Sequence, residues 1–356
     1  MAGSTTKKVA IVIPTWKRMD LLQKCLQSIE QQTVRDHETI VVSNGAAEWT
    51  ARLAETAGCT VLDLPSNLGF AAGVNAGLAH GNSPYVLVLN DDVELDPKWL
   101  ELTVSFLDKH PESSYCCGKI YQAGGALLDN AGDALSLGGS AWRLGFGRPA
   151  SAEFDVPRPI WAVSGTATLF RRTVFQEIGT FDEDFFAYLE DMDFSLRAAR
   201  AGFQGFYLPE AVSHHRGSAT LGPESPEVIR LLTRNQLILL AKHYPVSLLL
   251  RLAPRISWTQ SLWLLRAIWN RRFGAYLMGL MGFLRLLSSS IRKRTGWSRE
   301  ASQALLDRLV ISDREIFADI HAADRAERGR LLRMYFALFP PQGKRETAQQ
   351  GLRTAL

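Results

Sequence analysis

Residues 85–97, YVLVLNDDVELDP, join an apolar strand to a pair of adjacent acids. The run YVLVL has the length and composition of a buried β-strand, and Asn90, Asp91 and Asp92 follow it directly. Neighbouring carboxylates repel each other, so they stay ionised only with good solvation, a counter-charge or a metal ion. The end of this strand is therefore the first place where the sequence indicates chemistry. A solvated turn that happens to carry two acids is the alternative.

Similar apolar runs alternate with helical patterns on both sides of this strand. Strands are expected at residues 9–13, 39–42, 60–64, 85–89 and 203–208, and helices near residues 21–29, 48–57, 70–80 and 190–202, with another capped by Asp96 and carrying Pro97 in its first turn. This alternation predicts an α/β fold, Rossmann-like, with a mostly parallel sheet and helices on both faces. Ligands bind such sheets at the carboxyl ends of the strands, where Asp91 and Asp92 lie.

Residues 121–158 interrupt the alternation. Seven glycines fall between Gly124 and Gly147. Because this stretch is too long for an ordinary connection, we expect a functional loop or flap.

The composition is that of a folded protein. Hydrophobic residues make up 46% of the 356 residues and charged residues 21%. The four cysteines show no C-x-x-C spacing and the first residues, MAGSTTKKVAIVIP, contain no secretory leader. We expect reduced thiols in the cytoplasm.

The charge is unevenly distributed along the chain. Residues 228–299 contain thirteen Lys or Arg and no Asp or Glu, whereas the rest of the chain has 27 basic and 36 acidic residues. The longest apolar run, residues 273–284, is shorter than the roughly twenty residues of a spanning helix. These Trp- and Leu-rich basic helices favour contact with an anionic membrane surface, and the alternative is a helical subdomain packed on the body. We expect domains at 1–226, 227–299 and 300–356.

Three further stretches carry polar side chains in a suggestive arrangement. In PSNLGFAAGVNAG (65–77), Asn67 and Asn75 lie near a helix start that favours phosphate, although the glycines alone would suit tight packing on the sheet. In FDEDFFAYLEDMDFSLRAARAG (181–202), the pair Glu190-Asp191 could supply a general base, or could simply complement the helix dipole. HHRGSAT (214–220) offers two candidate metal ligands, or loop histidines that cap a backbone group.

Taken in order, the motifs resemble a known family. The stretches are IVIPTWKR (11–18), VVSNGA (41–46), NLGFAAGVNAG (67–77), LNDDVELDP (89–97), SGTATLFRR (164–172) and FDEDFF…EDMDFSLR…HHRGS (181–218). Over roughly residues 8–240 the chain resembles the family 2 glycosyltransferases of the GT-A fold, in particular the bacterial rhamnosyltransferase-like branch. The resemblance implies a GT-A catalytic domain followed by a helical C-terminal region.

The resemblance also implies residue roles. Asp191, with Glu190 beside it, matches the base of the E-D motif; Asp92 matches the last acid of the D-x-D metal motif, and His214 the usual metal-binding histidine, with His215 as the substitute. The implied donor-binding set is Pro14, Thr15, Arg18, Ser43, Asn67, Gly69, Asn75, Asp91 and Asp92.

Two positions depart from the family pattern. Ser43 stands where the family usually has an Asp that helps to hold the base or ribose, and Asn90 stands at the first D-x-D position. The first departure leaves the identity of the donor nucleotide undetermined. The second implies a weakly held metal that depends on Asp92, His214 and the donor diphosphate.

The expected function is that of an inverting glycosyltransferase dependent on Mg²⁺ or Mn²⁺. It moves one sugar per encounter, with dTDP-rhamnose as the first donor to consider, onto a polyprenyl-diphosphate-linked or saccharide acceptor in surface polysaccharide assembly. The expected place is the cytoplasmic face of the bacterial cell membrane, with no nucleic acid as partner. The alternatives are a sugar-1-phosphate nucleotidyltransferase, which should show a Gly-rich loop where IPTWKR has no glycine, and a catalytically silent membrane-bound scaffold.

Overall fold

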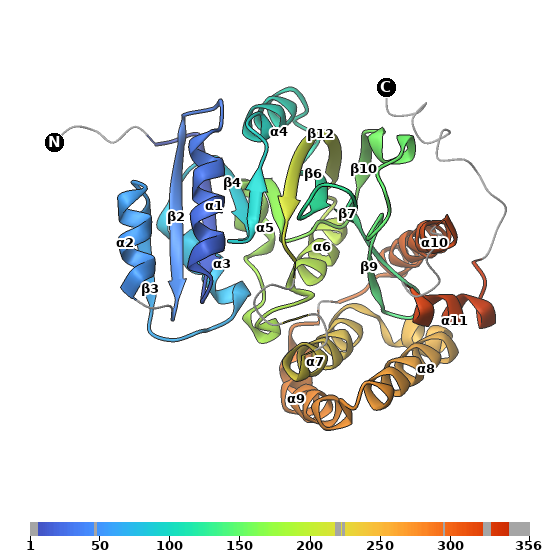
Figure 1. The fold of residues 1–356 in the computed structure, drawn as a ribbon. Coiled ribbons are helices and arrows are strands. Elements are labelled where there is room, and N and C mark those ends of the chain that lie inside the picture. The colour runs from blue at the N-terminus through green and yellow to red at the C-terminus, as the bar shows by residue number, and fades with distance from the viewer. Residues whose placement is uncertain are drawn as a thin grey trace.

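A computed structural model describes residues 6–45, 48–217, 222, 225–294, 296–322 and 329–341. Its main sheet has the strand order β10-β12-β6-β11-β4-β1-β2-β3, with β5 paired to β12 and β7 to β6 (Figure 1). The strands are β1 (Val9–Thr15), β2 (His37–Asn44), β3 (Thr60–Leu64), β4 (Tyr85–Leu89), β5 (Val93–Leu95), β6 (Tyr115–Gln122), β7 (Leu128–Asn130), β10 (Arg158–Ile160), β11 (Ala167–Arg171) and β12 (Gly205–His215).

Strands β1 to β4 are parallel, and β11 inserts antiparallel between β4 and β6. Helices cover both faces, namely α1 (Met19–Glu30), α2 (Glu48–Thr56), α3 (Phe70–His80), α4 (Trp99–Lys109), α5 (Arg172–Ile178) and α6 (Glu190–Arg200). Alternate residues of β1 point to opposite faces: Ile11 packs with the α1 and α4 side, and Val12 with the α3 and α6 side. The predicted α/β class with helices on both faces is confirmed. The sheet is mixed rather than mostly parallel, because four of its described strand pairings are parallel and five are antiparallel.

Three elements, β3, α3 and β4, have the bounds that the sequence predicts, and the other predicted elements differ at one or both ends. Strand β12 is longer than expected and continues to His215. Asp96 is not an N-cap, which corrects the prediction: α4 begins at Trp99 with Lys98 as its cap. Asp96 instead closes a turn, in which its carbonyl oxygen accepts from Trp99 N–H at 2.9 Å, and its carboxylate lies 3.6 Å from His214 Nε2.

The Gly-rich stretch 121–158 is an ordered part of the core. Besides β7 it contains a hairpin of β8 (Asp133–Leu135) and β9 (Ala141–Arg143), a short 3₁₀ helix, η1 (Ala152–Asp155), and β10. Ala134 and Leu135 are fully buried and pack against the C-terminal helices. The stretch therefore joins the sheet to those helices.

Five helices form the C-terminal region, as far as the structure describes it: α7 (Pro226–His243), α8 (Val246–Trp269), α9 (Phe273–Arg292), α10 (Arg299–Ala322) and α11 (Arg330–Leu338). Helix α7 lies against the carboxyl end of the sheet, and α8 and α9 lie outside it (Figure 1). By length and composition, α9 is the described helix that is apolar enough to cross a membrane, and 17% of it is buried.

Helix α3 packs on β1 through its glycines. A Cβ at Gly77 would lie 2.3 Å from Val12 Cγ1, and one at Gly73 would lie 2.8 Å from Pro14 Cβ. The tight-packing interpretation of these glycines is therefore correct. The close approach also brings the amino end of α3 to the end of β1.

We predict that Gly77→Ala destabilises the fold by about 1–3 kcal/mol, because Val12 is fully buried and cannot move aside freely. The control is Gly274→Ala in α9, where a Cβ meets nothing within 4 Å and Ala gains up to about 1 kcal/mol of helix propensity. Thermal unfolding of both variants tests this. Equal melting temperatures would show that α3 does not pack as described.

Candidate active site

A cavity of about 840 Å³ lies at the carboxyl ends of β1 and β4. Its walls come from these strand ends, the amino ends of α3 and α6, the β9 hairpin, α7 and α8. Eight of the predicted site residues line it: Pro14, Thr15, Asn67, Gly69, Asp91, Asp92, Glu190 and Asp191. The structure therefore brings the acids of NDD and of the E-D pair to one cavity.

Three of the predicted donor-binding residues, Arg18, Ser43 and Asn75, are not among those that line the cavity. Arg18 pairs with Asp20, and Ser43 is buried at the end of β2. The amide of Asn75 is bonded to the backbone of Phe181, donating to its carbonyl oxygen and accepting from its N–H. Asn75 thus holds the loop that leads to α6.

His215 lines the cavity, whereas His214, which the resemblance favours as the metal ligand, does not. Successive side chains of β12 point to opposite sides. His214 stacks on Tyr121, while His215 Nε2 lies 3.1 Å from Asp92 Oδ1 and its Nδ1 lies 2.9 Å from Asp129 Oδ2. Burial opposes protonation of His215, but the hydrogen bonds to Asp129 and Asp92 outweigh it and raise the pKa of His215 to about 9.

The other two residues of the NDD motif also face the cavity. Asp91 accepts a hydrogen bond from Thr15 Oγ1 at 2.6 Å, and burial raises its pKa to about 6. Asn90 Oδ1 is buried without a hydrogen-bond partner in the described chain. An orphaned acceptor in a cavity wall is costly unless a ligand supplies the donor, so this wall is suited to binding a polar ligand.

The opposite wall begins with a strained loop. Phe186, Tyr188 and Leu189 all have positive φ, which is rare for residues other than glycine. Asn235 of α7 holds this loop by donating from Nδ2 to the carbonyl oxygens of Ala187 and Tyr188, at 2.8 and 2.6 Å. Backbone strain of this kind persists where the surroundings enforce it, and it is common at functional sites.

The loop delivers Glu190 and Asp191 to the first turn of α6. Asp191 is fixed by backbone donors, with Gly165 N–H on Oδ2 at 3.0 Å and Met192 N–H on Oδ1 at 2.8 Å. Burial raises the pKa of Asp191, although these donors oppose the shift. Burial, followed by repulsion from Asp191, raises the pKa of Glu190 well above 4.5, and Glu190 Oε2 has no partner in the described chain.

Three site residues escaped the sequence analysis, namely Asp129, Asp133 and Arg143 of the Gly-rich stretch. Arg143 and Asp133 line the cavity, and Arg143 Nη1 lies 2.8 Å from Asp129 Oδ1. Burial, then repulsion from Asp191, raises the pKa of Asp133 to about 7. Asp129 thus links His215 to Arg143. The three-residue strands that carry these groups give no periodic signal, so only their charge could have marked them.

The cavity wall fits a divalent cation in part. No group of three His, Cys, Asp or Glu side chains arranged to hold a metal is present among the described residues. Asp92 and His215 nevertheless lie side by side, and a cation that displaced the proton between them would meet a carboxylate oxygen and an imidazole nitrogen. Asp129 orients the imidazole as carboxylates do in histidine metal sites. Mg²⁺ commonly takes one or two protein ligands and completes its shell with water and phosphate oxygens.

Residues 10–179 match the family model described as glycosyl transferase family 2. This part of the chain, just under half of its 356 residues, belongs to this family of glycosyltransferases. The predicted resemblance, which rested on motifs from residue 11 to residue 218, is confirmed. The family match explains the acids of the cavity without either alternative, the sugar-1-phosphate nucleotidyltransferase or the catalytically silent scaffold.

Curated relatives of this glycosyltransferase are bacterial. It is 26% identical over 242 residues to an N-acetylglucosaminyl-diphospho-decaprenol L-rhamnosyltransferase of Mycobacterium tuberculosis, which covers 60% of this chain and 78% of the relative. It is 28% identical over 236 residues to the O-antigen biosynthesis protein RfbC of Myxococcus xanthus, covering 62% of this chain and 18% of that one.

Among solved structures, the glycosyltransferase is similar to GalNAc-T7, whose crystal structure contains UDP, GalNAc and Mn²⁺. The TM-score is 0.50 at 13% identity, over 71% of this chain and about half (55%) of that one. This likeness confirms the GT-A fold alone.

We predict that Glu190→Gln reduces the pH dependence of stability. The raised pKa means that the folded protein keeps a proton that the unfolded chain releases near pH 4.5, so the stability from this group is fully present below that pH and is lost as the pH rises. The melting temperature of the wild type should therefore fall more between pH 4.5 and about pH 8 than that of Glu190→Gln. The exposed Glu55→Gln is the control, and parallel curves for all three proteins would contradict the prediction.

Proposed function

We propose that the protein is an inverting glycosyltransferase in which Asp191 deprotonates the acceptor hydroxyl. The observation that carries the proposal is the placement of two acidic walls on one cavity, with Asp91 and Asp92 at the strand end and Asp191 at the start of α6. The strand-end wall, with a divalent cation bound, would suit a nucleoside diphosphate. The wall at the start of α6 would suit the attacking hydroxyl. A single displacement between them inverts the anomeric centre.

Asp191 has the geometry of a base. Its two oxygens accept from the backbone N–H groups of Gly165 and Met192, so the backbone holds the carboxylate in one orientation. Its raised pKa brings it nearer to that of the proton donor, which favours proton transfer in the transition state. The acceptor oxygen then attacks the anomeric carbon as its proton moves to Asp191, and the nucleoside diphosphate leaves from the opposite face.

The strand-end wall would stabilise the leaving group. Asp92 and His215 would hold Mg²⁺ or Mn²⁺, which supplies Lewis-acid stabilisation of the charge on the diphosphate. Asn67 and Gly69 lie at the amino end of α3, where backbone N–H groups and the helix dipole favour phosphate. Pro14 and Thr15 would border the nucleotide.

The mycobacterial relative supports a choice of donor and acceptor, because its name gives rhamnose as the sugar and a decaprenyl-diphosphate-linked acceptor. We infer rhamnose from dTDP-rhamnose as the first donor to test, and a polyprenyl-diphosphate-linked saccharide in surface polysaccharide assembly as the acceptor. The acid-free stretch 228–299 supports a place at the cytoplasmic face of the membrane, as a peripheral protein.

Asp191→Asn should lower the rate of sugar transfer by about 10²–10⁴-fold, the usual contribution of a general base. Its affinity for the nucleoside diphosphate should stay within about twofold, because the side chain lies on the acceptor wall. Transfer of radiolabelled sugar and calorimetric titration measure the two quantities. Asp63→Asn, which changes an exposed carboxylate on β3, is the control. Lost diphosphate binding in Asp191→Asn would contradict the assignment.

His215→Ala should weaken the Mg²⁺-dependent binding of a nucleoside diphosphate by about tenfold or more, whereas His214→Ala should have little effect. The two histidines are adjacent, and the cavity is lined by His215 alone of the pair. Calorimetric titration with dTDP, UDP and GDP, each with Mg²⁺ and again with chelator, tests this and identifies the nucleotide. Equal effects of the two substitutions would remove His215 from the proposed site.

A further inference from the structure

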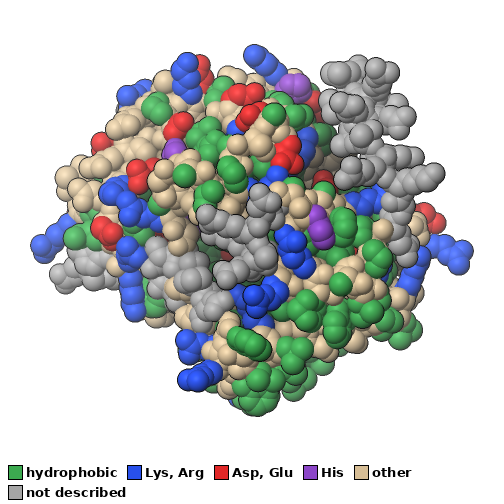
Figure 2. Space-filling model, turned by 45° about the vertical axis from the view of Figure 1, so that its right-hand side comes forward, with side chains coloured by type: hydrophobic (Ala, Val, Ile, Leu, Met, Phe, Trp, Pro, Cys, Tyr) green, Lys and Arg blue, Asp and Glu red, His purple; other side chains and the backbone are tan. Residues whose placement is uncertain are grey.

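The outer face of α8 and α9 is a continuous apolar surface, which we name the α8–α9 face. Its apolar side chains are exposed by 40% at Leu277 to 85% at Trp269. The members of the face are Leu265, Ile268, Trp269, Phe273, Leu277, Met278, Met281 and Leu284. Figure 2 shows hydrophobic side chains gathered over this end of the molecule, with Lys and Arg beside them. Apolar surface of this extent indicates a binding partner.

The charge around this face identifies the partner as an anionic bilayer. Arg271 and Arg285 are exposed beside the apolar side chains. Other basic residues of the acid-free stretch 228–299, such as Lys242 and Arg255, are instead paired with acids elsewhere in the chain. An apolar helical face with Trp and flanking arginines is the pattern of helices that lie in the headgroup region of a membrane.

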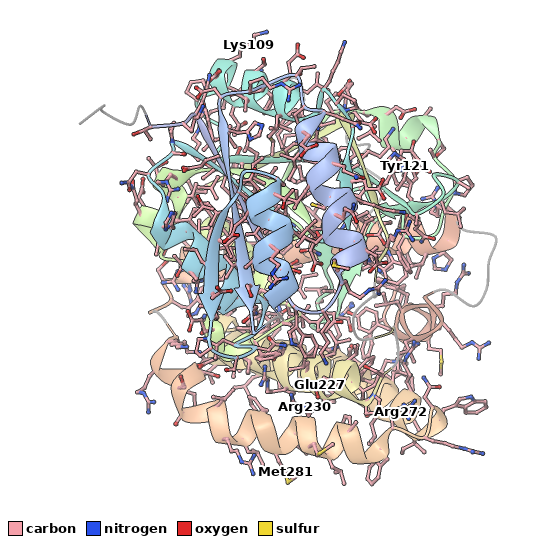
Figure 3. The ribbon with its side chains drawn as sticks, turned by 60° about the vertical axis from the view of Figure 1, so that its left-hand side comes forward. Lys109, Tyr121, Glu227, Arg230, Arg272 and Met281 are labelled. Atoms are coloured by element: carbon pink, nitrogen blue, oxygen red, sulfur yellow. The ribbon has the colours of Figure 1, made fainter. Side chains whose placement is uncertain are left out.

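The packing of α9 indicates that it lies along the surface rather than across it. A Cβ at Gly279 would lie 2.5 Å from the Arg230 carbonyl oxygen of α7, and one at Gly282 would lie 3.1 Å from Arg234 Cδ. The glycine side of α9 is thus pressed against the body, and Met281 points away from it (Figure 3). One face of α9 is therefore left for lipid.

The same helices form one wall of the cavity. Val228 and Leu232 of α7 line it, together with Arg266 of α8. Arg266 lines the cavity, and Trp269, the most exposed apolar side chain of the α8–α9 face, follows three residues later. The two side chains are therefore less than one helical turn apart on α8. Glu227 also lines this wall, but it is paired with Arg230 through Oε2 at 2.9 Å.

We propose that the acceptor enters the cavity from the bilayer, with the α8–α9 face inserted among the lipid headgroups and Arg266 binding the phosphate of a polyprenyl diphosphate. This rests on the proposed function, because it takes the acceptor to be lipid-linked. A polyprenyl diphosphate keeps its chain in the membrane and its phosphates at headgroup level. The planar guanidinium of Arg266 suits phosphate there, and the saccharide beyond it extends toward Asp191.

Vesicle binding tests the surface. The full-length protein should bind vesicles of phosphatidylethanolamine with about 30% phosphatidylglycerol, and the double variant Trp269→Ser, Phe273→Ser should bind about tenfold or more weakly, because two large apolar side chains leave the lipid. Ile311→Ser is the matched control, since Ile311 is 53% exposed on α10. Unchanged binding by the double variant would overturn the proposal.

Addition of undecaprenyl diphosphate to the vesicles tests Arg266. This lipid should increase the vesicle binding of the wild type. The increase should be about tenfold smaller for Arg266→Gln and unchanged for Arg251→Gln, which alters the exposed side of α8. No increase for the wild type, or equal losses in the two variants, would overturn the proposal.

Calorimetry with the nucleoside diphosphate separates the two walls of the cavity. Arg266→Gln should bind it as the wild type does, which also shows that the variant is folded. Weakened binding would place Arg266 on the donor side and refute its role toward the acceptor. Both assays are independent of catalysis, so a failure of sugar transfer would count against the proposed function and not against this entry route.

Discussion

The first turn of α6 carries three acids, of which Glu190 and Asp193 are buried and Asp191 is partly buried, and the rest of the molecule is arranged around them. Burial opposes ionisation of Asp193, but His243 and Lys242 of α7 outweigh it and hold the pKa of Asp193 well below its usual value. Asp191 receives backbone donors, and Glu190 has a raised pKa. Helix α7 thus pairs with Asp193, whereas Glu190 and Asp191 line the cavity.

The sequence predicts the position of Asp91 and Asp92 because strands and their ends leave a local signal. YVLVL predicts a buried strand, and the polar residues after it must lie at the carboxyl edge of the sheet. The choice between His214 and His215 was not accessible in this way. It depends on the register of β12 against β6, which pairs His214 with Tyr121 and His215 with Gln122, and on the bulge between Leu208 and Val212 that precedes it.

The β8–β9 hairpin was not predictable for a different reason. Its strands are three residues long, and its position is set by α10, more than 170 residues away in sequence. Asp319 of α10 accepts from Trp142 Nε1 at 2.7 Å and from Gly145 N–H at 3.0 Å. Local periodicity does not predict partners so distant in sequence. The sequence therefore indicates only that this stretch is unusual and does not predict that Asp133 and Arg143 line the cavity.

The hydrogen bonds from Asn235 to the strained loop before α6 limit how glycosyltransferases of this kind can change during evolution. The strained loop before Glu190 and Asp191 is held by a helix that follows the sheet, so replacing the C-terminal helices as a module would disturb the loop. A chimera that joins residues 1–225 to the helices of another family member would release Ala187 and Tyr188 from their donor unless that helix supplies an equivalent amide. New acceptor preferences should therefore arise by substitutions on the outer helices, where side chains change without disturbing the loop.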